Sequence, residues 1–254
     1  MLLGLLFAII ALFYASVGFG GGSSYLALLI LWDIPYSMIP IIALICNISV
    51  VSGNSFHYVR AGYLKKQMLI PTLFTSVPFA YMGGRLEIEK DIFVITLFIA
   101  LLFTGIRMLV NFRKYENEDI DSYNDISILA GALIGAVLGF LAGVVGIGGG
   151  IFLAPILYNI RAGSPKQIAT TCSLFILINS IAGIIGQLHK TGIASSIIDY
   201  WFLPILVIIG GQLGNHITLK FLPSRIIALL TGLLVLFVSA KLGWKIICLP
   251  STVI

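Results

Sequence analysis

Charged residues are scarce in this sequence. Only 10% of its 254 residues are Asp, Glu, Lys or Arg, whereas 59% are hydrophobic and the mean hydropathy is +1.09. A soluble domain carries about 25% charged residues, because these cover its surface in water. The composition therefore excludes a soluble protein and indicates a chain that crosses a cell membrane several times.

Other absences restrict the chemistry. No acidic residue lies within 126–198 or 200–254, which argues against a carboxylate proton relay or an acidic cation site inside the membrane. The HExxH and GxSxG patterns are absent, so we expect no enzyme activity and no cofactor. The three cysteines are far apart and show no metal-binding spacing, so we expect no metal site. The net charge of +5 is not gathered on one face, so we expect no nucleic-acid partner.

Eight hydrophobic runs predict the membrane segments. They lie near 2–31, 36–59, 67–84, 92–110, 126–159, 166–189, 197–219 and 225–248. The first and fifth runs are longer than the roughly 20 helical residues that a bilayer requires, and each carries a glycine cluster in its middle. We therefore predict an all-α polytopic membrane protein in which the helices of the first and fifth runs are broken at these clusters.

The two halves of the sequence repeat. Residues 18–22, Gly-Phe-Gly-Gly-Gly, match residues 146–150, Gly-Ile-Gly-Gly-Gly, at a shift of 128. After a two-residue insertion, glycines, a proline and a basic residue recur in the same order. The only long polar stretch separates the halves. The sequence thus predicts a first membrane repeat at 1–110, a polar linker at 111–125 and a second membrane repeat at 126–254.

The orientation of the repeats depends on the glycine segments. Eight full crossings would make the halves parallel, whereas glycine segments that turn back within the bilayer would make them inverted. The inverted arrangement places ten of the fifteen Lys and Arg residues on one side, and the parallel arrangement places nine there. Because basic loops favour the cytoplasm, the count favours inverted repeats.

The glycine clusters are the first candidate site. A GxGGG run should break a helix, because glycine adopts positive φ freely. The unpaired backbone groups must then face protein or a water-filled cavity, because lipid cannot bond them. Secondary transporters direct half-helix N-termini at anions in this way. The alternative is close helix packing without any ligand.

The second run of each half supplies further polar side chains. Asn47, Asn54 and His57 are spaced by seven and three residues, so they share one helical face. Thr171 and Gln187 occupy the corresponding run of the second half. Polar groups in a membrane span face the protein interior, where they contact a ligand or only join helices by hydrogen bonds.

Arg60 and Lys190 end these two runs. They either extend to the lipid headgroups or attract anions towards the glycines. The predicted substrate-binding residues are Gly20, Gly21, Gly22, Ser23, Asn47, Asn54, His57, Gly148, Gly149, Gly150, Thr171 and Gln187.

Two stretches carry a family resemblance. Residues 146–155, Gly-Ile-Gly-Gly-Gly-Ile-Phe-Leu-Ala-Pro, are followed at 169–175 by Ala-Thr-Thr-Cys-Ser-Leu-Phe, and the glycine cluster recurs at 18–22. With these stretches the chain resembles the TauE/SafE sulfite exporter family. The first half departs from the pattern, because Ser23, Ser24 and Tyr25 replace apolar residues after the glycines.

The resemblance implies a secondary transporter of small anions, chiefly sulfite and organosulfur anions. From the two repeats we expect it to work by alternating access, with one half rocking against the other. The expected partners are a small anionic solute and the lipid bilayer. Coupling to a proton or to the anion's own gradient is left open, as is assembly into an oligomer. An anion channel and a membrane scaffold without a transported substrate are the two alternatives.

Overall fold

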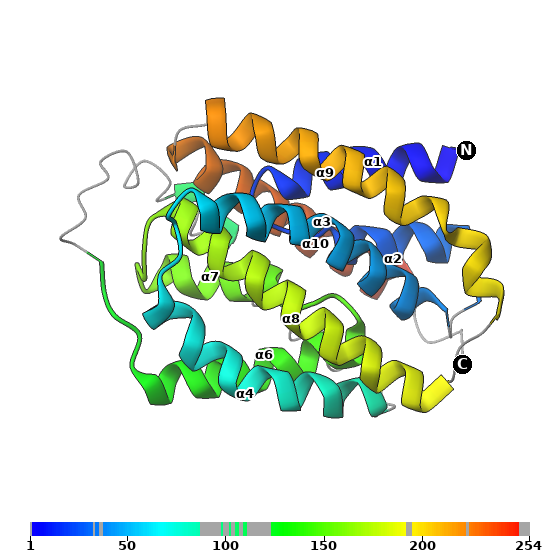
Figure 1. The fold of residues 1–254 in the computed structure, drawn as a ribbon, viewed down its shortest axis with the longest axis horizontal. Coiled ribbons are helices and arrows are strands. Elements are labelled where there is room, and N and C mark those ends of the chain that lie inside the picture. Colours follow the sequence, from blue (N-terminus) through cyan, green and yellow to red (C-terminus); the bar gives the residue numbers. More distant parts are fainter. Residues whose placement is uncertain are drawn as a thin grey trace.

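The computed structural model describes residues 2–32, 34–35, 38–86, 123–191, 195–221 and 224–248, with a few residues between 98 and 110. Nearly all of these residues form helices (Figure 1). In chain order the helices are α1 (Leu2–Ala15), α2 (Gly22–Leu31), α3 (Ile39–Arg60), α4 (Lys66–Arg85), α6 (Ile128–Val145), α7 (Gly150–Asn159), α8 (Pro165–Thr191), the 3-10 helix η3 (Ser195–Tyr200), α9 (Phe202–Phe221) and α10 (Ser224–Cys248).

Most of the predicted run 92–110, and all but the end of the linker predicted at 111–125, lie outside the described residues. Among the described residues, three helices are long and apolar enough to cross a membrane, namely Ile39–Arg60, Ile128–Val145 and the Pro165–His189 part of α8. Large apolar side chains on the outside of the bundle, such as Phe74 at 82% exposure, suit contact with lipid.

Both predicted helix breaks are confirmed. The first run forms α1 and α2, which have 14 and 10 residues, and the fifth run forms α6 and α7, which have 18 and 10 residues. At 1.5 Å per residue, the 10-residue helices are only about 15 Å long, half of a bilayer core of about 30 Å. Each glycine segment reverses the chain, so that α2 runs back beside α1 and α7 runs back from the end of α6 (Figure 1).

The two halves run in opposite directions. In Figure 1, α1 and α3 run from right to left, whereas their counterparts α6 and α8 run from left to right. The helices α2 and α4 likewise oppose α7 and α9. This is the inverted arrangement that the distribution of basic residues favours.

Glycines also let helices of the two halves pack closely against one another. Helix α6 of the second half packs on α4, with Gly135, Gly139 and Gly143 against the backbone of residues 72–80. In the same way, α9 packs on α1 of the first half, with Gly210 and Gly214 against the backbone carbonyls of residues 8 and 12. Small residues let helix backbones approach closely inside a membrane. The first helix of each half is therefore paired with the fourth helix of the other half.

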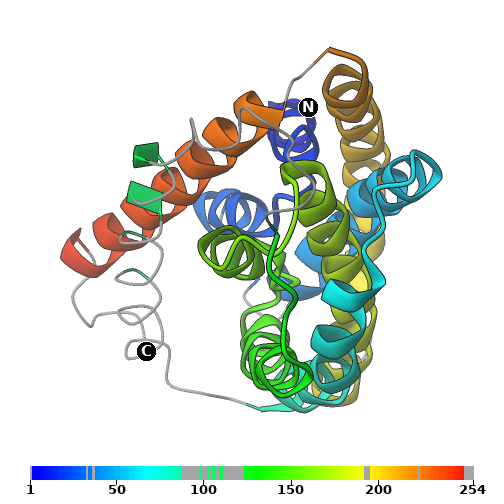
Figure 2. The same ribbon diagram turned by 90° about the vertical axis from the view of Figure 1, so that its left-hand side faces the viewer.

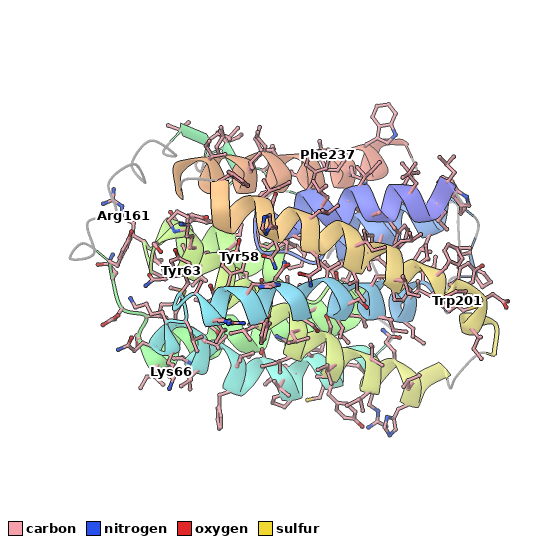
Figure 3. The ribbon with its side chains drawn as sticks, turned by 45° about the horizontal axis from the view of Figure 1, so that its top comes forward. Tyr58, Tyr63, Lys66, Arg161, Trp201 and Phe237 are labelled. Carbon is pink, nitrogen blue, oxygen red and sulfur yellow. The ribbon has the colours of Figure 1, made fainter. Side chains whose placement is uncertain are left out.

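Loops from both halves meet at one end of the bundle. Lys65 forms a 3.0 Å ion pair with Asp125 and donates to the Ala162 carbonyl at 2.9 Å, and Lys166 donates to the Tyr63 hydroxyl at 3.3 Å. We call the end formed by residues 60–66 and 158–166 the basic end. Figure 3 shows Tyr63, Lys66 and Arg161 there and Trp201 at the opposite end.

Candidate functional site

Each glycine cluster forms a tight turn, and two corresponding glycines of each turn have a left-handed backbone. The second turn has a third such residue, Gly148 with φ 79°, whereas its counterpart Gly20 has no positive φ. In the first turn, Gly18 and Gly21 have φ values of 83° and 87°. Their counterparts at a shift of 128, Gly146 and Gly149, have φ values of 76° and 79°. These values lie in the left-handed region, which glycine adopts without strain and other residues rarely adopt. The repeated sequence thus produces a repeated reversal of the chain.

Each turn leads into a half-helix whose first N–H groups are unpaired. Ser24 of α2 and Phe152 of α7 are the first residues after Gly22 and Gly150 to bond back to their turns, at 3.0 and 3.1 Å. Among the described residues, no acceptor takes the N–H groups of Gly22 and Gly150, and both glycines are buried. Buried helix ends without partners are unfavourable unless a ligand or water bonds them.

The two half-helices meet N-terminus to N-terminus. They extend in opposite directions from the middle of the molecule in Figure 1, and they lie close together in Figure 2, which looks along the helices. A Cβ atom on Gly22 would lie only 3.1 Å from the Ile147 carbonyl oxygen of the second turn. Each helix N-terminus carries a partial charge of about +0.5. Two positive ends therefore face one another inside the protein.

No described carboxylate neutralises these ends. The acidic residues that the structure describes, Asp125 and Asp199, are both exposed outside the bundle interior. No group of three His, Cys, Asp or Glu side chains comes together within the described ranges. The arrangement therefore offers positive backbone charge and hydrogen-bond donors, which suit a small anion.

Asn47 of α3 lies between the two turns. Its side chain is fully buried, and its Nδ2 donates to the Ile147 carbonyl at 3.0 Å. A Cβ atom on Gly20 would collide with Oδ1 of Asn47, and a Cβ atom on Gly22 would lie 2.5 Å from its Nδ2. Oδ1 of Asn47 accepts no hydrogen bond from any described group. A side chain of the first half thus holds the turn of the second half and presents an unpaired oxygen at the first turn.

A side chain of the second half makes the reciprocal contact. Ser173 of α8 donates from Oγ to the Gly18 carbonyl at 2.7 Å, and both groups are buried. Asn54, two helical turns after Asn47, donates weakly to the Phe19 carbonyl at 3.4 Å. The crossed hydrogen bonds of Asn47 and Ser173 therefore join the two repeats at their glycine turns.

Ser180 adds a further unpaired polar group, besides Oδ1 of Asn47 and Oδ1 of Asn54. It is fully buried, its Oγ has no partner among the described residues, and it lies 2.8 Å from the position of a Cβ on Gly148. Sequence reasoning did not assign Ser173 or Ser180 to the site, because a single serine in a membrane helix usually joins helices. Their spacing of seven residues, the same as between Asn47 and Asn54, was the available signal.

Most of the predicted substrate-binding residues come together at these turns. They are Gly20, Gly21, Gly22, Ser23, Asn47, Asn54, Gly148, Gly149 and Gly150. Ser23 begins α2 and is half-buried, with its hydroxyl 3.4 Å from that of Tyr14, which bonds the neighbouring Ser24 at 2.9 Å. Neither serine therefore caps α2, because both hydroxyls face α1.

Three other predicted residues use their polar groups elsewhere. His57 Nε2 lies 3.0 Å from Gln212 Oε1 on α9. Thr171 donates to a carbonyl of its own helix at 3.0 Å. Gln187 donates at 3.3 Å to the Gly143 carbonyl, which belongs to the last turn of α6. Their roles in substrate binding stay predictions.

Arg60 and Lys190 lie at opposite ends of the bundle. Arg60 ends α3 at the basic end and is exposed, whereas the last turn of α8, with Lys190, reaches the opposite end (Figure 1). The Lys190 side chain lies outside the described residues. The backbones of the two residues therefore lie at opposite ends of the bundle, as the inverted repeat requires.

Comparisons with known proteins show what the chain is similar to. The family model described as sulfite exporter TauE/SafE matches residues 3–242. A probable membrane transporter protein of Sinorhizobium fredii is 27% identical over 242 residues, which cover 95% of this chain and 97% of the relative. A probable membrane transporter protein of Methanocaldococcus jannaschii is 28% identical over 170 residues, which cover 63% of this chain and 61% of the relative. No solved structure matches the chain significantly.

Proposed function

Because the chain belongs to the TauE/SafE sulfite exporter family and is therefore a membrane transporter, we propose that it carries small sulfur oxyanions, sulfite or an organosulfur anion, through a site between α2 and α7. The observation that supports this function is the pair of half-helix N-termini that face one another without a described counter-charge.

The electrostatics favour a small oxyanion. Two facing ends of about +0.5 each repel one another, and an anion between them turns this repulsion into attraction. The unpaired N–H groups of Gly22 and Gly150 are donors that oxyanion oxygens accept. Arg60 at one end and Lys190 at the other would each raise the local concentration of anions at one side of the membrane.

The inverted repeats supply a route to alternating access. The crossed bonds from Asn47 to Ile147 and from Ser173 to Gly18 link the two halves at the proposed site. If one half rocks against the other, these bonds are remade, so the site can close to one side as it opens to the other. Transporters with inverted repeats and broken helices work in this way.

The variant Asn47→Asp tests the site directly. It keeps the shape of the side chain but places a negative charge between the two N-termini, so we expect exchange of labelled sulfite in proteoliposomes to fall to background. Asn124→Asp is the matched control, because exposed Asn124 also donates from Nδ2 to a backbone carbonyl, that of Ile160, at 3.0 Å. It should exchange sulfite at the wild-type rate.

Equal exchange by the two variants would contradict the proposed site. Large unitary currents without counterflow would identify the protein as an anion channel and not a carrier. If no sulfur oxyanion moved through the wild-type protein or raised its melting temperature, a scaffold function would take the place of transport.

A further inference from the structure

The orientation of the Asn47 side chain bears on which form of the anion binds. Its Nδ2 and Oδ1 atoms can be told apart here, because the Ile147 carbonyl 3.0 Å from one of them can only accept a hydrogen bond. If the amide were flipped, Oδ1 of Asn47 would lie against the Ile147 carbonyl oxygen, and two acceptors would repel one another. Oδ1 is thereby fixed on the side of Gly20, whereas the position of a Cβ on Gly22 lies 2.5 Å from Nδ2 and 3.1 Å from Oδ1.

Oδ1 of Asn47 is an acceptor without a donor. The side chain is fully buried, and no described group donates to this oxygen. An unpaired buried acceptor is unfavourable by an amount that corresponds to about a tenfold to hundredfold change in affinity for a ligand that pairs it. Ser180 Oγ does not impose the same demand, because a hydroxyl can donate or accept.

A fully deprotonated oxyanion cannot meet this demand. Its oxygens accept from the N–H groups of α2 and α7, but they offer no hydrogen to Oδ1 and would repel it. An anion that bears one O–H group provides acceptors for the half-helices and a donor for Asn47. Relying on the proposed function, we infer that the site takes a protonated monoanion, hydrogensulfite, in preference to the sulfite dianion.

The charge of the site supports the same form independently. The two N-termini together supply about one positive charge. The described residues that surround the turns, including Asn47, Asn54, Ser173 and Ser180, are uncharged. One negative charge is therefore balanced, whereas a dianion would bring a second charge into a medium that penalises it.

The first test measures the affinity of the purified wild-type protein for total sulfite as a function of pH. Above the second dissociation of sulfurous acid, the apparent dissociation constant should rise about tenfold per pH unit, because the protonated form declines by that factor. Methanesulfinate, a monoanion in which a methyl group replaces the hydroxyl of hydrogensulfite, is the control. It does not titrate in this range, so its affinity should stay constant.

An affinity for total sulfite that is constant with pH would overturn the inference. The inference would also fail if the affinity for methanesulfinate fell in parallel as the pH rises, because the titrating group would then belong to the protein and not to the ligand. A second test compares the affinities of the two ligands at one low pH. There the wild-type protein should bind hydrogensulfite about tenfold to a hundredfold more tightly than methanesulfinate.

The variant Asn47→Ala should reduce this preference towards unity, while Asn124→Ala should keep it. The preference is the ratio of two dissociation constants measured on the same variant, so a general loss of stability affects both and cancels. If Asn47→Ala does not fold, the pH dependence of sulfite binding to the wild-type protein alone tests the inference. An unchanged preference in folded Asn47→Ala would refute the role of Oδ1. If the wild-type protein binds neither ligand, the proposed function fails as well, whereas equal binding of both overturns only the preference.

Discussion

Replacing Gly149 with alanine tests whether the glycine turns need their left-handed backbone and their close packing. At φ 79°, an alanine costs about 1–2 kcal/mol in backbone strain. Its Cβ would also lie 3.0 Å from both Ala142 Cβ and a ring carbon of Phe175, an overpacking worth about 1–3 kcal/mol. The matched variant is Gly62→Ala, because Gly62 has φ 83° but no atom within 4 Å of a Cβ. Gly149→Ala should therefore lose about 1–3 kcal/mol more than Gly62→Ala.

In a Cys248→Ser background, the buried thiols of Cys46 and Cys172 report unfolding, because a thiol-reactive dye reaches them only when the protein opens. With about 2–4 °C per kcal/mol for a chain of this size, Gly149→Ala should melt roughly 2–12 °C below Gly62→Ala. Gly183→Ala completes the series, since its helical Cβ would meet atoms at 3.5–3.9 Å and should leave stability unchanged or slightly raised. Equal melting of all three variants would refute the strained, crowded turn.

Two further predictions concern the crossed contacts and the sidedness. Ser173→Ala leaves the buried Gly18 carbonyl unpaired and should lower the free energy of unfolding by about 1–3 kcal/mol. The control Ser49→Ala removes a hydrogen bond within one helix and should lower it by less than about 1 kcal/mol. Equal losses of the two variants in thermal unfolding would contradict the role of the Ser173 bond. The distribution of Lys and Arg predicts that the basic end faces the cytoplasm. A membrane-impermeant maleimide should therefore label Trp201→Cys from outside cells and Arg161→Cys only in inside-out vesicles, and the reverse pattern would contradict this topology.

The helix breaks and the repeat could be predicted because short local motifs determine them. A GxGGG cluster supplies positive φ at Gly18 and Gly21, and its copy does the same at Gly146 and Gly149. Helix lengths follow from the apolar runs. The direction of the halves followed more weakly, from the count of basic residues, because it depends on where the chain turns and not on any single motif.

The assembly of the site could be predicted only in part. Seven residues bring a helix almost back to the same angle, so Asn47 and Asn54 both reach the first turn, whereas three more residues rotate His57 away towards Gln212. The bond from Ser173 to the Gly18 carbonyl joins residues 155 apart in sequence. Such contacts depend on how the halves pack, which no local pattern encodes.

Selenite offers the most direct measurement of the central claim, because it has the shape and charge states of sulfite and its selenium scatters anomalously. In crystals grown with selenite, an anomalous peak should lie between α2 and α7, with selenite oxygens within hydrogen-bond distance of the Gly22 and Gly150 N–H groups and of Asn47 Oδ1. A peak confined to the basic end or the protein surface, with the two N-termini packed against each other and no anion between them, would contradict it.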